Sequence, residues 1–127
     1  MGRGTILWMC MFIASTFLLI EPSMAQDAKS GSAVFKQRCA ACHAIEPGVS
    51  SAMGPSLVGV VGRKSGSLSG FAYSNAMKNS GVVWGEAELE LFIQNPQKFV
   101  KGTKMYAPGI SDAGVRADLI TYLGSLE

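Results

Sequence analysis

The chain has 127 residues, of which 48% are hydrophobic and 16% charged, and its formal net charge is +2. This length allows one small domain and excludes a barrel enzyme or a doubly wound nucleotide-binding fold. The net charge is too small for a nucleic-acid binder, which must neutralise several phosphates, and the low charge content argues against an intrinsically disordered chain.

The N-terminus has the three parts of an export signal. Arg3 supplies a positive charge, an uncharged and mostly apolar run extends from Ile6 to Ile20, and Ser23-Met24-Ala25 places small residues where a signal peptidase requires them. This run is too short for a membrane span, which needs about 20 apolar residues. We therefore expect a signal peptide over residues 1–25, cleaved after Ala25, and one exported domain over residues 26–127. An uncleaved membrane anchor is the alternative.

A helix followed by a long loop is expected in the first half of this domain. The pattern predicts a helix from Ser30 to Cys42, with Ser30 or Ser32 as N-cap and Phe35 on its apolar side. Residues 44–72 show no apolar period and contain glycine at positions 48, 54, 59, 62, 66 and 70. A loop of this length is uncommon in a compact domain unless it wraps around something.

Three further helices are expected in the second half. A short one spans Ser74–Asn79, and a better one spans Glu86–Asn95, where Pro96 stops it. The last begins after Ser111 or Asp112 as cap and has apolar residues at helical spacing, namely Val115, Leu119, Tyr122, Leu123 and Leu126. The fold class is therefore all-α, with three to four short helices and long loops. Such elements cannot form a regular bundle, which indicates that part of the core is missing.

The segment Cys39-Ala40-Ala41-Cys42-His43 supplies that part, because Cys-x-x-Cys-His is the attachment signature of c-type haem. Two thiols at this spacing add to the two vinyl groups of one porphyrin edge, and the adjacent imidazole binds the iron. A thioredoxin-like redox pair would need a strand and a parallel sheet, which the pattern does not predict. A zinc site would need further ligands, and His43 is the only histidine.

The second axial ligand of the iron must be something other than histidine. The methionines outside the export signal are Met53, Met77 and Met105, and a methionine in a small protein is usually a packing residue. Met105 lies in a turn beyond Pro96 that can present a thioether to the haem. Spacing favours Met105 and leaves the other two open.

Several longer segments show a resemblance to a known family, in its order and spacing. These are CAACH at 39–43, GPSLVGVVGRKSG at 54–66, GFAYSNAM at 70–77, Trp84, NPQKFVKGTKM at 95–105 and RADLITYL at 116–123. From Gly31 to Leu123 the chain resembles class I cytochromes c of the mitochondrial type, in their bacterial periplasmic form. The resemblance implies the cytochrome c fold around one covalently attached haem c.

The resemblance also implies roles for individual residues. Cys39 and Cys42 form the thioethers, while His43 and Met105 are the axial iron ligands. The carbonyl of Pro55 accepts the other imidazole N–H and so orients the ring. The haem propionates are held by Tyr73, Trp84 and Thr103, with Arg63 offsetting their charge. The contact between the first and last helices is made by Gly31, Phe35, Leu119 and Tyr122.

Some positions depart from the family pattern. Phe92 stands where the family commonly has a tyrosine bonded to the methionine sulfur, Met77 replaces an asparagine, and Ala107 replaces a frequent phenylalanine. The expected docking face keeps four cations, Arg38, Lys98, Lys101 and Lys104. Gln97, Ser111 and Asp112 occupy places where mitochondrial relatives often carry lysine.

The implied function is that of a periplasmic, monomeric, one-electron carrier rather than an enzyme, shuttling between a quinol-oxidising complex and a terminal oxidase or other acceptor. Its partners are redox proteins that dock on the basic face, and nucleic acid is not among them. The sequence leaves two alternatives open. One is a dedicated electron-transfer subunit of a single periplasmic dehydrogenase. The other is a haem peroxidase or gas sensor in which Met105 leaves the iron.

Overall fold

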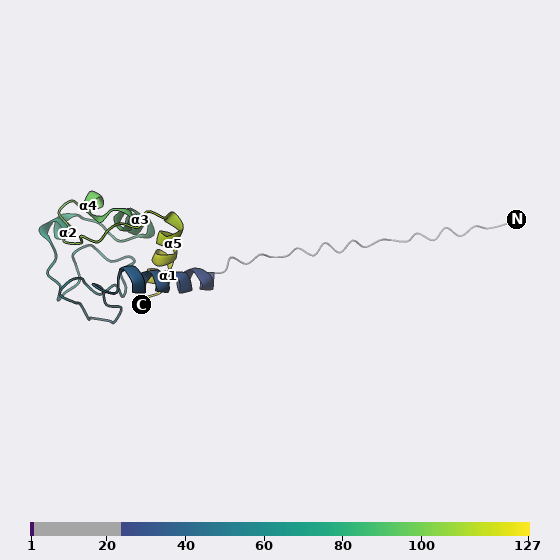
Figure 1. Ribbon diagram of the computed structural model, residues 1–127, viewed down its shortest axis with the longest axis horizontal. Coiled ribbons are helices and arrows are strands. Elements are labelled where there is room, and N and C mark those ends of the chain that lie inside the picture. Colours follow the sequence, from purple (N-terminus) through teal and green to yellow (C-terminus); the bar gives the residue numbers. More distant parts are fainter. Residues whose placement is uncertain (2–23) are drawn as a thin grey trace.

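The computed structural model describes Met1 and residues 24–127, and within this part of the chain the ordered elements are α-helices. They are α1 (Met24–Arg38), α2 (Asn75–Asn79), α3 (Glu86–Gln94), α4 (Pro96–Phe99) and α5 (Ala113–Gly124), connected by long irregular segments (Figure 1). Lys64 and Val83 form one isolated antiparallel bridge. The expected all-α fold is confirmed. The export signal lies almost wholly outside the described residues, and none of the helices described is long and apolar enough to cross a membrane.

Helix α1 is displaced relative to the expected Ser30–Cys42 helix. It begins at Met24 and ends at Arg38, so Ser30 and Ser32 lie inside it and neither is the N-cap. No proline or glycine interrupts residues 24–30, and Asp27 in the first turn favours a helix start there. Beyond Arg38 the N–H groups of Cys39 and Ala40 both donate to the Phe35 carbonyl, at 2.8 and 2.9 Å. The two cysteines therefore lie in tight turns after the helix.

Pro96 separates two helices instead of ending one. It stops α3 at Gln94, because it has no N–H to donate, but its fixed φ suits the first position of a new helix. The side chain of Asn95 caps that helix by accepting from the N–H of Lys98 at 3.1 Å. The interpretation of Pro96 as a helix stop followed by a turn was wrong in this respect, because α4 begins at this residue.

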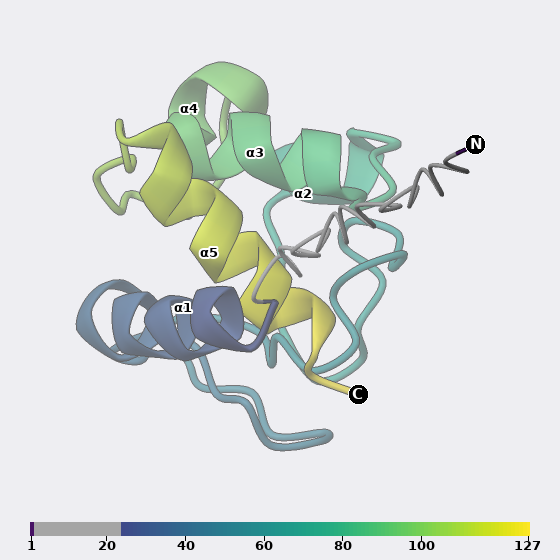
Figure 2. The ribbon, with the colours of Figure 1, turned by 90° about the vertical axis from the view of Figure 1, so that its right-hand side faces the viewer.

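Helix α5 lies between α1 and the pair formed by α3 and α4 (Figure 2). The side chain of Asp112, and not that of Ser111, caps α5 by accepting from the N–H of Val115 at 2.9 Å. The expected contact between the first and last helices is confirmed. Phe35 and Tyr122 pack with ring centroids 5.8 Å apart, and Leu119 is 1% exposed.

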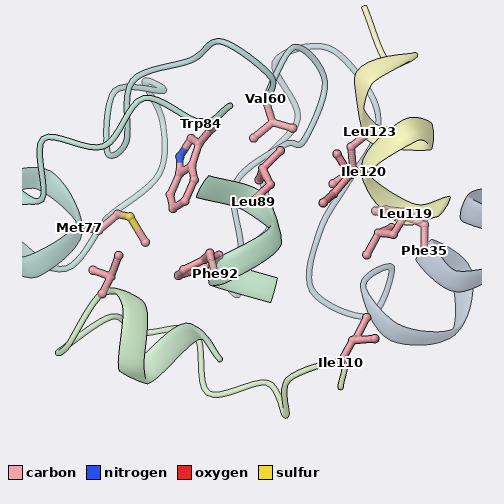
Figure 3. Close-up of a cluster of buried hydrophobic side chains, with 11 residues drawn as sticks. Phe35, Val60, Met77, Trp84, Leu89, Phe92, Ile110, Leu119, Ile120 and Leu123 are labelled. Atoms are coloured by element: carbon pink, nitrogen blue, oxygen red, sulfur yellow. The ribbon is translucent and has the colours of Figure 1, made fainter. Parts of the chain in front are cut away.

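The buried apolar side chains extend from this helix contact toward the loops (Figure 3). In the close-up, Phe35 and Leu119 meet at one end of the cluster, and Met77, Trp84 and Phe92 gather at the other. The side chains at this second end come from α2, from the segment before α3 and from α3 itself. They form part of the wall of a cavity.

Candidate functional site

The cavity has a volume of about 350 Å³ and is lined largely by apolar side chains. It is bordered by the turn after α1, the long loop, α2, α3, the segment after α4 and α5. All nine residues that the sequence singles out for haem binding line it, namely Cys39, Cys42, His43, Pro55, Arg63, Tyr73, Trp84, Thr103 and Met105. Residues separated by up to 66 positions thus share one site.

The two thiols and the imidazole enter the cavity from the turn that follows α1. Cys39 and Cys42 are half-buried and are not joined by a disulfide. Burial raises the pKa of the Cys39 thiol to about 11, and the positive charge of Arg38 only partly offsets this effect. Because neither sulfur is in a disulfide, both are available to form bonds to a ligand.

The imidazole of His43 is held in one tautomer. Its Nδ1 lies 2.8 Å from the carbonyl oxygen of Pro55, which can only accept, so Nδ1 carries the hydrogen. Burial lowers the pKa of His43 and so favours the neutral ring. The lone pair of Nε2 is then free to bind a metal ion, as the family pattern implies.

Gly54 forms the surface against which this imidazole packs, a role that the sequence analysis missed. A Cβ at position 54 would lie 2.7 Å from Cε1 of His43 and 2.8 Å from the carbonyl oxygen of Cys42. Any side chain here would displace the ring. The only signal in the sequence is its place directly before Pro55, and close approach of a glycine is not visible without the fold.

The polar residues of the cavity have different surroundings. Arg63 is half-buried and donates to the carbonyls of Ser56 and Val58 at 2.9 and 3.1 Å, so part of its guanidinium holds the loop. Burial raises the pKa of Tyr73, although the charge of Arg63 opposes the shift, and its hydroxyl therefore remains a donor. Trp84 is 7% exposed, and its indole lines the cavity.

All three methionines left open by the spacing line the cavity. Met53 is 72% exposed, Met77 is buried in α2, and Met105 is half-buried on an irregular segment. Proximity alone therefore does not select one thioether. The N–H of each methionine donates to a nearby hydroxyl, and only for Met105 is that hydroxyl, on Thr103 at 3.3 Å, buried.

Phe92 makes the wall beside Trp84 apolar. Their ring centroids are 4.9 Å apart, and Phe92 is itself buried. Phe92 and Met77 are both departures from the family pattern. Each places an apolar side chain where the family commonly has a polar one, a tyrosine or an asparagine. Ala107 also lines the cavity and is exposed.

A helical domain in which a Cys-x-x-Cys-His turn faces an apolar cavity of this kind is a class I c-type cytochrome. The sequence model of the family described as "Cytochrome c" matches residues 28–127, and the chain belongs to this family. Cytochrome c2 of Blastochloris viridis is 47% identical over 104 residues, which is 82% of this chain and 81% of that protein. Cytochrome c of Sesamum indicum is 46% identical over 97 residues, 76% of this chain and 87% of the relative.

A solved structure agrees with these sequence matches. Cytochrome cH from Methylobacterium extorquens superposes with a TM-score of 0.73 at 44% identity, covering 78% of this chain and 98% of that one. Membership of the family means that the protein carries one covalently attached haem c and is a monohaem electron carrier. The paired thiols, the oriented imidazole and the apolar cavity fit this cofactor.

Proposed function

We propose that this protein is a periplasmic one-electron carrier that shuttles between a quinol-oxidising complex and a terminal oxidase or other acceptor. The observation that carries the proposal is one cavity lined by two thiols, one oriented imidazole and the thioether of Met105. Haem c, when bound, supplies the iron that takes up and releases a single electron. His43 and Met105 are its proposed axial ligands, and Cys39 and Cys42 its covalent attachment points.

The protein groups favour reversible electron transfer over substrate chemistry. The hydrogen bond from His43 to Pro55 orients the imidazole and strengthens its donation to a metal. The soft thioether of Met105 and the apolar walls both favour the less charged, reduced state. If His43 and Met105 both bind the iron, it would have no open position for a substrate, so the proposed role is that of a carrier and not of an enzyme.

The four polar residues at the cavity are the proposed partners of the haem propionates. Trp84 contributes an indole N–H, and Tyr73 contributes a hydroxyl. Thr103 is nearly fully buried, and its hydroxyl already accepts from Met105. Arg63 adds the positive charge that offsets two carboxylates, while two of its N–H groups stay on the loop carbonyls.

Docking of redox partners is proposed for the exposed cations Arg38, Lys98, Lys101 and Lys104. Arg38 and Lys104 border the cavity itself, so part of this charge lies beside the proposed haem site. A positive face steers an acidic partner and raises the association rate at low ionic strength. The carrier is proposed to act as a monomer.

Export is proposed to remove residues 1–25. Cleavage after Ala25 would take only Met24 and Ala25 from α1 and would leave the contact of Gly31 and Phe35 with α5 intact. We expect the intact mass of the mature holoprotein to correspond to a chain that begins at Gln26 and carries one haem. A mass that includes the apolar N-terminus would show instead that the segment is retained as an anchor.

The ligand assignment is tested by the ferric spectrum. We expect wild type to show the charge-transfer band of thioether-bound iron and Met105→Ala to lose it completely, because Met105 is the proposed ligand. Met53→Ala and Met77→Leu are the matched controls and should retain the band. Survival of the band in Met105→Ala would contradict the assignment. Rapid carbon monoxide binding by the wild-type ferrous protein would favour the gas-sensing alternative.

A further inference from the structure

The segment that carries Met105 has few backbone restraints of its own. Within residues 24–127, no backbone–backbone hydrogen bond is made by residues 104–109. The segment is flanked by Thr103, whose N–H donates to Val100 at 3.0 Å, and by Ile110, whose N–H donates to Ile93 at 3.0 Å. Tyr106, directly after Met105, is 81% exposed. How firmly the Met105 side chain is held in place therefore depends on side-chain contacts to this segment.

Gln97 makes the contacts that replace the missing backbone bonds. Its Nε2 donates to the carbonyl oxygens of Thr103 and Met105, both at 3.0 Å. Because both partners can only accept, the amide is oriented with its NH2 group toward the segment and uses both of its hydrogens there. The two carbonyls lie before Lys104 and after Met105, so the side chain of Gln97 restrains the backbone at both ends of this dipeptide.

The base of this side chain is fixed. Gln97 is the second residue of α4, between the buried Pro96 and Lys98, whose N–H is bound by the cap Asn95 at 3.1 Å. Helix α4 also packs against α3, which forms part of the cavity wall. The only other side-chain tie to the segment from a distant element is Lys104 Nζ to the carbonyl of Ala72 at 2.9 Å, among the described residues, and this bond is exposed.

We propose that Gln97 is a positioning residue that clamps the Met105 segment and so determines how readily the thioether leaves the iron. This inference rests on the proposed ligation by Met105. A lysine, common at this position in mitochondrial relatives, presents a flexible ammonium in place of a planar amide with two directed donors. The departure from lysine at position 97 thus has a structural consequence at the ligand and not only on the docking face.

The test is displacement of Met105 by imidazole in the ferric holoprotein, followed by loss of the thioether charge-transfer band. A neutral hydrogen bond changes an equilibrium constant roughly 2- to 12-fold. Gln97→Met keeps the length of the side chain and removes both donors, and we expect it to tighten imidazole binding about tenfold. Gln97→Glu keeps the shape and turns the donor group into an acceptor, so it should tighten binding at least as much and carries the test if the first variant folds poorly.

Two comparisons separate a clamp from a general effect on folding. Gln94→Met makes the same change at an exposed glutamine of α3 and should bind imidazole like wild type. In a Met105→Ala background there is no thioether to displace, so Gln97→Met should no longer change imidazole affinity. An equal change in both backgrounds, or unchanged affinity in both Gln97 variants, would overturn the clamp while leaving Met105 ligation intact. Absence of the band in wild type would overturn the ligation itself, and the clamp with it.

Discussion

Replacing Gly31 with alanine is expected to lower the free energy of unfolding of the holoprotein by about 3 kcal/mol, at the upper end of the effects of overpacking. A Cβ at position 31 would lie 2.0 Å from the carbonyl oxygen of Asp118 and 2.6 Å from Cβ of Tyr122. The first of these groups is backbone in α5 and cannot rotate away, so α1 and α5 must move apart. The separation would loosen the packing of Phe35 against Tyr122.

The measurement is denaturant or thermal unfolding, where we expect the melting temperature to fall by roughly 12–24 °C. Gly124→Ala is the matched control, because its Cβ would meet only Val61 at an ordinary 3.9 Å. Helix propensity alone would make either alanine stabilising, by up to about 1 kcal/mol. A Gly31→Ala protein that is as stable as the Gly124→Ala protein would show that α1 and α5 are not held this closely.

The second large effect that we expect is that of Arg116→Met, which should lower the free energy of unfolding by about 3 kcal/mol. Its guanidinium is buried in α5, forms an ion pair with Glu90 of α3 at 2.6 Å, and donates to the carbonyl of Ile110 at 2.7 Å. Methionine fills much of the space but leaves the Ile110 carbonyl without its donor. Ile110 is where the Met105 segment rejoins the core, so the same substitution frees that end of the segment.

Denaturant unfolding and imidazole affinity of the ferric protein together check this expectation. Stability should fall while imidazole binding tightens, because one anchor of the segment is lost. Lys36→Met removes an exposed cation from α1 and should change the free energy of unfolding by no more than about 0.5 kcal/mol. An Arg116→Met protein with the stability of this control would show that the ion pair and the carbonyl contact contribute little.

The local elements were predictable where one strong signal decided them. The apolar spacing around Leu119 and Tyr122 predicted α5, and Pro96 predicted the end of α3. The start of α1 was not predictable in this way. Ser30 and Ser32 are good N-caps but are also tolerated inside a helix, and no residue from 24 to 29 breaks the helix before them. Helix α4 was missed because a proline was taken as a stop, and Asn95 turns the same proline into a start.

The functional site was likewise predictable only in part. The Cys39–His43 motif, together with the export signal, predicted the cofactor, because the chemistry of attachment requires those residue types at that spacing. The contact of Gly54 with His43 and the clamp by Gln97 carry no such signal. Each depends on two segments approaching to within van der Waals or hydrogen-bonding distance, and many residue pairs at those separations never meet.

The sequence by itself therefore determined the all-α class, the haem c and the family to which the chain belongs, since these follow from local composition and a covalent motif. The tertiary structure alone decided that Met53 and Met77 border the same cavity as Met105, that Gly54 packs against His43, and what restrains the segment bearing Met105. The reason is physical. Covalent attachment is encoded in five consecutive residues. How firmly a ligand side chain is held in place depends instead on hydrogen bonds and packing between helices and loops that only folding brings together.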